Sequence, residues 1–298
     1  MSEILTIPSN KLTFSGHDTF HCRHLWLKKG YDFVKKGNKF TDSEAVVLLG
    51  VGKNMVSAIF FWMKAFALID KDGNTTDVAD YIFSSEGKDQ YLEDEATLWL
   101  LHYQLTSQGI ASIYHLVFNY LRKEKIEFTK ENFLVFAERK ANEIGFTQFN
   151  KKTAATDFDV MTRMYIRTND QIKDKEDTSS GLLTDLNLIQ EEKKHNSIYS
   201  IPNESRNNLP EEVILYTILD QSNIQNSVSL NSLSQDRNMA GSVFAITKNA
   251  LMEKLESVAN NIQYQKYGIT LSDHAGIKEL QFTSKPDKFE ILNLYYGK

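Results

Sequence analysis

The chain has 298 residues, enough for two domains or for one domain with elaborations. Its net charge of −5 excludes nucleic-acid binding through overall charge, so any such affinity has to come from local patches. Four prolines and fourteen glycines are few, which favours long helices over a β-sandwich. The single cysteine, Cys22, excludes a disulfide within the chain and fits a reducing, cytoplasmic environment. The most apolar run, residues 55–69, is too short to span a bilayer, so no membrane association is expected.

The first predicted helix lies within residues 14–30, the most polar and unusual region of the chain. Ser15 or Asp18 is expected to cap it, because both side chains accept hydrogen bonds from backbone N–H groups. The helix is predicted to run to Lys29 and to end at Gly30.

Three histidines in this region are candidates for chemistry. His17, His21 and His24 are spaced four and three residues apart, so they would share one face of the predicted helix. They are weak candidates for a metal site, because no second cluster supplies the usual paired ligands. His17 and Asp18 are alternatively a catalytic acid–base pair. The remaining interpretation is structural, with both side chains making capping hydrogen bonds.

A second helical region follows at residues 42–83. Asp42 is expected to cap a short helix that breaks at residues 50–52, where glycines permit a sharp turn. A longer helix is predicted from Lys53 to Leu68, followed by a turn at residues 70–74. Helix, glycine turn, helix and hairpin-like tip is the order of a helix-turn-helix with a wing.

Several polar side chains are expected to contact DNA if this arrangement is a DNA-reading one. The second helix of such a motif places its N-terminal residues against base edges and its lysines near phosphates. Residues 1–68 are mildly basic, with nine basic and five acidic side chains. A helical hairpin used for packing or protein contact is the alternative. The predicted DNA-binding residues are Lys53, Asn54, Ser57, Lys64, Lys28 and Lys29.

The middle of the chain is predicted to be helical up to about Arg167. Asp157 and Asp159 in its last helix are two residues apart, so they do not share a helix face, and a salt-bridged surface or interface is expected for both. Residues 169–180 are nearly devoid of apolar side chains, which is typical of a linker or long loop. A small β-element is expected at residues 198–201.

The last part of the chain repeats the winged-helix order. A helix starting at Pro210, a short helix at 227–234, a long helix at 243–260 and two strands around residues 273–277 are predicted. The fold class is therefore mainly α, with winged-helix-like N-terminal and C-terminal units joined by a helical middle and with small β-hairpin wings. The predicted segments are 1–90 (N-terminal unit), 91–168 (helical middle), 169–207 (linker and small β-element) and 208–298 (C-terminal unit).

Five motifs, at residues 14–20, 26–30, 49–56, 62–66 and 97–102, resemble those of a bacterial family of uncharacterised domains that are encoded near genes for DNA sulfur modification (phosphorothioation) and phage defence. One relative, the SspB-type component of single-strand phosphorothioation systems, is regarded as a DNA nickase. The resemblance extends from about residue 14 to residue 282, and its N-terminal motifs are the more specific.

The resemblance implies a DNA-engaging component of a modification or defence system. A DNA-binding component is the leading hypothesis, with double-stranded DNA and sulfur-modification or defence proteins as partners and no cofactor. One alternative is a nickase in which His17 and Asp18 act, with a divalent metal in that case, although the chain shows no recognisable nuclease signature. The other is an adapter for a sulfur-transfer enzyme of the phosphoadenosine-phosphosulfate reductase type. A homodimer is left open.

Overall fold

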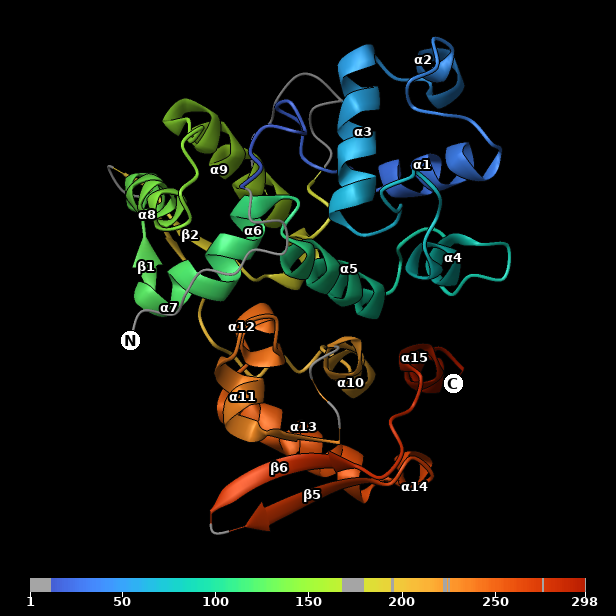
Figure 1. Cartoon of the computed structure of the whole chain (residues 1–298), viewed down its shortest axis with the longest axis vertical. Coiled ribbons are helices and arrows are strands. Elements are labelled where there is room, and N and C mark those ends of the chain that lie inside the picture. The colour runs from blue at the N-terminus through green and yellow to red at the C-terminus, as the bar shows by residue number, and fades with distance from the viewer. Residues whose placement is uncertain are drawn as a thin grey trace. The chain divides into compact units, whose positions relative to one another are not determined.

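The chain divides after Ile201 into an N-terminal unit, Met1–Ile201, and a C-terminal unit, Pro202–Lys298. The structure is a computed structural model that describes residues 12–167, 180–193, 196–221, 224, 226–274 and 276–297. Both units are mainly helical, and each contains a three-stranded antiparallel sheet (Figure 1). This confirms the mainly α class with small β-elements. The finer four-segment division stays a prediction.

The first half of the N-terminal unit is built from four helices. α1, α2 and α3 pack on one another, and α4 packs on α1. Phe33 of α1, Leu49 of α2 and Val56 of α3 share one apolar cluster. The bounds are α1 (Trp26–Lys35), α2 (Ala45–Leu49), α3 (Lys53–Ala65) and α4 (Asp77–Phe83).

The prediction of a helix that ends at Gly30 is wrong. α1 begins at Trp26, and the preceding residues form turns and irregular backbone, in which Ser15 and Asp18 have left-handed φ angles of 69° and 53°. Gly30 lies inside α1, where an added Cβ would lie 2.8 Å from Sδ of Met63 on α3. Glycine therefore permits a close approach of two helices here and does not mark a helix end.

The turn between α2 and α3 follows the prediction more closely. Gly50 ends α2 in the left-handed conformation, with φ of 64°. Asp42 does not cap α2, because its carboxylate accepts the Lys39 N–H at 3.1 Å and the helix begins only after Glu44. α3 ends at Ala65, three residues earlier than predicted. The tip at residues 70–74 is closed by a single antiparallel bridge between Ile69 and Thr75.

The second half of the N-terminal unit surrounds α5 (Glu95–Gln108), in which 12 of 14 residues are buried. Asp94 caps its start and Gly109 ends it with φ of 71°. The strand predicted around residue 198 is confirmed as the middle strand of a sheet with order β1-β3-β2. The linker predicted at residues 169–180 lies, up to residue 179, outside the described residues. The other elements are α6 (Ser112–Leu116), a π-helical turn η1 (Val117–Leu121), α7 (Arg122–Glu124), β1 (Glu127–Phe128), α8 (Lys130–Glu143), α9 (Lys151–Tyr165), a 3₁₀ turn η2 (Thr184–Leu186), β2 (Gln190–Glu192) and β3 (Ile198–Ser200).

The C-terminal unit packs helices against the sheet β4-β6-β5 (Figure 1). The helix predicted at residues 227–234 is only partly confirmed. Residues 227–229 form the strand β4, and the helix α11 begins at Leu230. The long helix predicted at 243–260 is interrupted at Ala245, whose φ is 50°, and restarts with Thr247 as its cap. The elements are α10 (Glu211–Asp220), β4 (Ser227–Ser229), α11 (Leu230–Gln235), α12 (Ala240–Phe244), α13 (Lys248–Asn260), α14 (Ile262–Gln265), β5 (Ile269–His274), β6 (Ile277–Phe282) and α15 (Lys288–Tyr296).

Candidate nucleic-acid interface

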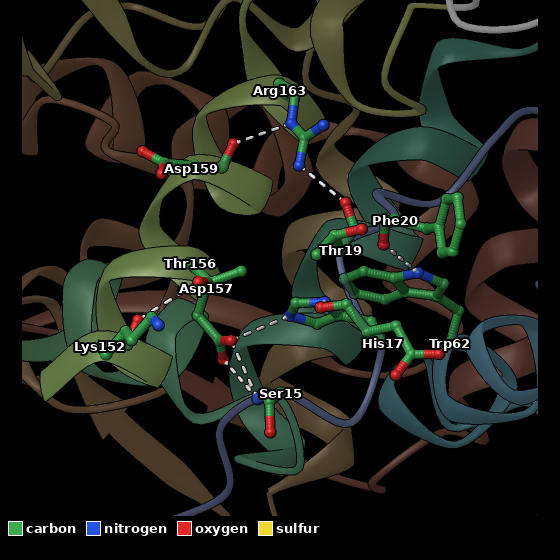
Figure 2. Close-up of polar contacts among 11 residues, drawn as sticks. Ser15, His17, Thr19, Phe20, Trp62, Lys152, Thr156, Asp157, Asp159 and Arg163 are labelled. Atoms are coloured by element: carbon green, nitrogen blue, oxygen red, sulfur yellow. Dashed lines mark hydrogen bonds and ion pairs between the residues drawn. The ribbon is translucent and has the colours of Figure 1, made fainter. Parts of the chain in front are cut away.

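His17 is a buried side chain in the N-terminal unit. It is 1% exposed, and its ring stacks on the indole of Trp62, with centroids 5.2 Å apart and planes 5° apart (Figure 2). Its Nδ1 lies 3.1 Å from the backbone carbonyl oxygen of Asp18. Its Nε2 lies 3.4 Å from Oδ1 of Asp157, a distance typical of an ion pair and long for a hydrogen bond.

Asp157 is the carboxylate that faces His17; it has a charged partner as expected, but the expected surface position is wrong. It is 2% exposed on α9, not a surface residue. Its two oxygens accept the N–H of Ser15 at 2.9 and 3.1 Å, and Arg163, one and a half turns further along α9, donates to the Thr19 carbonyl at 2.7 Å. The segment 15–19 is thus clamped onto α9 at two points (Figure 2). Asp159, by contrast, is exposed and pairs with Lys130 at 2.6 Å, as expected.

A signal for the burial of Asp157 was present in the sequence. The residue lies three positions after Ala154 and four before Met161, so it falls within the apolar stripe of a helix. Both neighbours in that stripe are fully buried. A charged residue in such a stripe is expected to have a buried partner.

The clamp has the geometry of a structural contact. Asp18 is exposed, and its contact with Nδ1 of His17 is made by its backbone carbonyl oxygen. A ring that is 1% exposed and stacked on an indole leaves no room beside it for a substrate. The catalytic assignment of His17 and Asp18 stays a prediction, which this geometry does not support.

The other two histidines have surroundings that differ from those of His17. His21 is partly buried, whereas His24 is exposed, with Nε2 2.5 Å from the Tyr91 carbonyl oxygen. The helix that would have aligned them with His17 does not form. Within the described ranges, no three His, Cys, Asp or Glu side chains gather as metal ligands.

The exposed face of α3 gathers the leading DNA-binding candidates. Lys53, Asn54 and Ser57 are exposed in its first two turns. Lys53, Ser57, Phe60 and Lys64 follow one another at spacings of four, three and four residues, so they share one face of the helix. This face presents two ammonium groups, a hydroxyl and an aromatic ring in one line.

The remaining predicted lysines differ in how they are engaged. Lys28 pairs with Asp32 at 2.6 Å, so its charge is already partly neutralised. Lys29 is exposed. The Nζ of Lys64 lies 3.7 Å from the centroid of the Phe60 ring, and partial burial lowers the pKa of this lysine. The candidates thus lie on α1 and α3, two helices that pack together.

Comparison with known proteins places these features in a family. The family described as "Protein of unknown function (DUF4007)" matches residues 14–296. The chain belongs to this family. Two solved structures resemble this DUF4007 chain: a magnesium ion-bound SspB crystal structure and an SspB crystal structure. Each is 28% identical to this chain, with a TM-score of 0.85. The match covers 96% of this chain and 88% of the SspB chain. The predicted resemblance to an SspB-like domain is confirmed. No curated protein matches the chain significantly.

The magnesium ion of that SspB structure raises the question of whether this DUF4007 chain has side chains to hold one. Among the residues that the structure describes, no cluster of three His, Cys, Asp or Glu side chains forms. None of the described helices combines the length and the apolar character needed to cross a bilayer.

Proposed function

We propose that the chain is a double-stranded DNA-binding component of a bacterial phosphorothioation or phage-defence system. The observation that supports this most directly is the exposed run of Lys53, Asn54 and Ser57 at the start of α3. Lysine suits phosphates and asparagine suits base edges, at the position where a recognition helix makes such contacts. The likeness to SspB structures supports the link to phosphorothioation.

Winged-helix architecture is part of this proposal. In the N-terminal unit, α2 and α3 are joined by the left-handed Gly50, α1 packs on both, and the Ile69–Thr75 bridge would be a minimal wing. The C-terminal unit follows the order helix, strand, four helices, two strands and a final helix, with the sheet β4-β6-β5. We assign DNA contact to α3 and not to α13, because α13 exposes Glu253 and Glu256, which repel phosphates.

The other functions considered receive less support. A nickase that uses His17 and Asp18 would need a substrate to reach a buried ring. An adapter for a sulfur-transfer enzyme would leave the basic face of α3 without a role. A homodimer stays a prediction, which sedimentation of the purified chain would test.

The test is a fluorescence-anisotropy titration of a labelled duplex over a series of salt concentrations. We expect affinity to fall as salt rises and Lys53→Ala to weaken binding while lowering the salt slope by about 1, the value for one lost phosphate contact. Asn54→Ala should weaken binding without changing the slope.

Lys151→Ala is the matched control, because Lys151 is an exposed lysine that begins a different helix, α9, as Lys53 begins α3. It should bind like the wild type. Absence of duplex binding at low salt, or equal effects of the two lysine substitutions, would contradict the proposal.

A further inference from the structure

A cavity of about 260 Å³ lies beside α3, between the segment that joins α1 to α2 and the turn that follows α3. Two partly exposed rings, Phe40 and Phe60, line it, with centroids 5.0 Å apart and planes at 33°. The buried ring of Phe33 packs against the ring of Phe40, with centroids 4.9 Å apart. The cavity therefore has an aromatic wall that is anchored in the apolar cluster of α1, α2 and α3.

Another part of the cavity lining is the turn at residues 70–74, which is fixed by its own hydrogen bonds. Oδ1 of Asp70 accepts the N–H groups of Asp72 and Asn74, each at 2.9 Å. These bonds hold the pKa of the Asp70 carboxyl below its usual value. Gly73 has a φ of 86° and an open space where a Cβ would be. Because the turn is held in shape, little ordering is needed when a ligand binds.

Charged and polar groups surround the aromatic wall. Lys39 and Asp72 line the cavity, and the Lys64 ammonium lies 3.7 Å from the centre of the Phe60 ring. These groups match the features of a nucleotide. Its flat ring can stack on phenylalanine, its phosphate can lie beside an ammonium, and its amino group can face a carboxylate. Drug-sized ligands occupy roughly 300–1,000 Å³, so this smaller cavity suits a single ring system.

We propose that this cavity binds one unpaired nucleobase of a DNA strand that lies along the exposed face of α3. The inference rests on the proposed function, because Lys53, Ser57, Phe60 and Lys64 share that face and would lead the strand from the start of α3 to the cavity. A free nucleotide has the same chemistry, but it would not use Lys53, which lies almost two turns before Phe60. The protein would then distinguish distorted or partly single-stranded DNA from an intact duplex.

The experiment compares two labelled duplexes that differ only in one bulged, unpaired adenine. We expect the wild type to bind the bulged duplex about tenfold more tightly, the effect of one base stacked on an aromatic ring. Phe60→Leu keeps an apolar side chain but removes the ring, so it should abolish this preference. Phe40→Leu should act in the same direction. Lys53→Ala should weaken binding of both duplexes.

Phe149→Leu is the matched control, since Phe149 is also partly exposed and also packs on a second ring, Phe14, at 5.7 Å. It should retain the preference. Equal binding of both duplexes by the wild type, or a preference retained in Phe60→Leu, would overturn the inference while leaving duplex binding intact. If neither duplex binds, the proposed function itself fails. An affinity for free deoxyadenosine monophosphate equal to that for the bulged duplex would overturn the assignment to a DNA strand.

Discussion

Replacing Asp157 with alanine should destabilise the N-terminal unit far more than the same change at Asp159, two residues along α9. Asp157 is 2% exposed, accepts the Ser15 N–H with both oxygens and faces His17. Removal of one member of a buried, hydrogen-bonded pair costs about 3–5 kcal/mol, and that range already includes the hydrogen bond that the Ser15 N–H loses. Alanine returns about 0.5 kcal/mol of helix propensity. The net expectation is about 3 kcal/mol.

Asp159→Ala is the matched control. Asp159 is exposed, and its pair with Lys130 is a surface ion pair, which contributes about 0.2–1 kcal/mol. The same gain in helix propensity offsets most of that loss. The expected net change is therefore less than about 0.5 kcal/mol.

Urea unfolding followed by tryptophan fluorescence measures both variants. All three tryptophans, Trp26, Trp62 and Trp99, lie in the N-terminal unit, so the signal reports this unit alone. With a slope of about 2 kcal/mol/M, Asp157→Ala should lower the urea midpoint by about 1.5 M and Asp159→Ala by less than about 0.3 M. Equal shifts in the two variants would refute the role assigned to the clamp.

Three further outcomes are expected. Cys22 is fully buried, and burial raises the pKa of its thiol, so a thiol reagent such as Ellman's should modify it only in denaturant; rapid reaction of the native protein would contradict this. Gly50→Ala should cost about 1 kcal/mol of stability, because φ there is 64°. Gly52→Ala is the control, since an added Cβ meets no atom at either glycine; at a φ of −65° it should cost a few tenths of a kcal/mol at most. Equal urea midpoints for the two variants would refute the argument. Gly30→Ala should cost up to about 2 kcal/mol, because overpacking against Met63 costs about 1–3 kcal/mol while alanine regains about 1 kcal/mol of helix propensity; a raised melting temperature would show that α1 and α3 have room to separate.

Local signals in the sequence predicted the parts of the fold that depend on local chemistry. Thr129 and its partner Asn132 form a capping box at the start of α8, and Pro210 directly precedes α10. The exposed start of α3 was predicted in the same way, from the glycine turn before it. Such elements are stabilised by groups within a few residues of one another, so single-sequence patterns contain the information.

The misassigned segments depend on partners that are distant in the sequence. The conformation of residues 15–19 is held by Asp157 and Arg163, about 140 residues away. In the sequence Gly30 is typical of a helix end, but its role depends on Met63 of α3, which packs against it. The aromatic cavity likewise combines Phe40, Phe60 and the turn at residues 72–74, which are brought together only by the packing of α1, α2 and α3.

The clamp of residues 15–19 onto α9 also affects how the chain acquires its fold during synthesis. Its two anchoring contacts close loops of 142 and 144 residues, so they form late compared with the local helices. Translation proceeds from the N-terminus, and the segment has to wait until α9 has left the ribosome. The imidazole of this segment covers the indole of Trp62, so the clamp also completes the burial of an aromatic surface formed early in the chain.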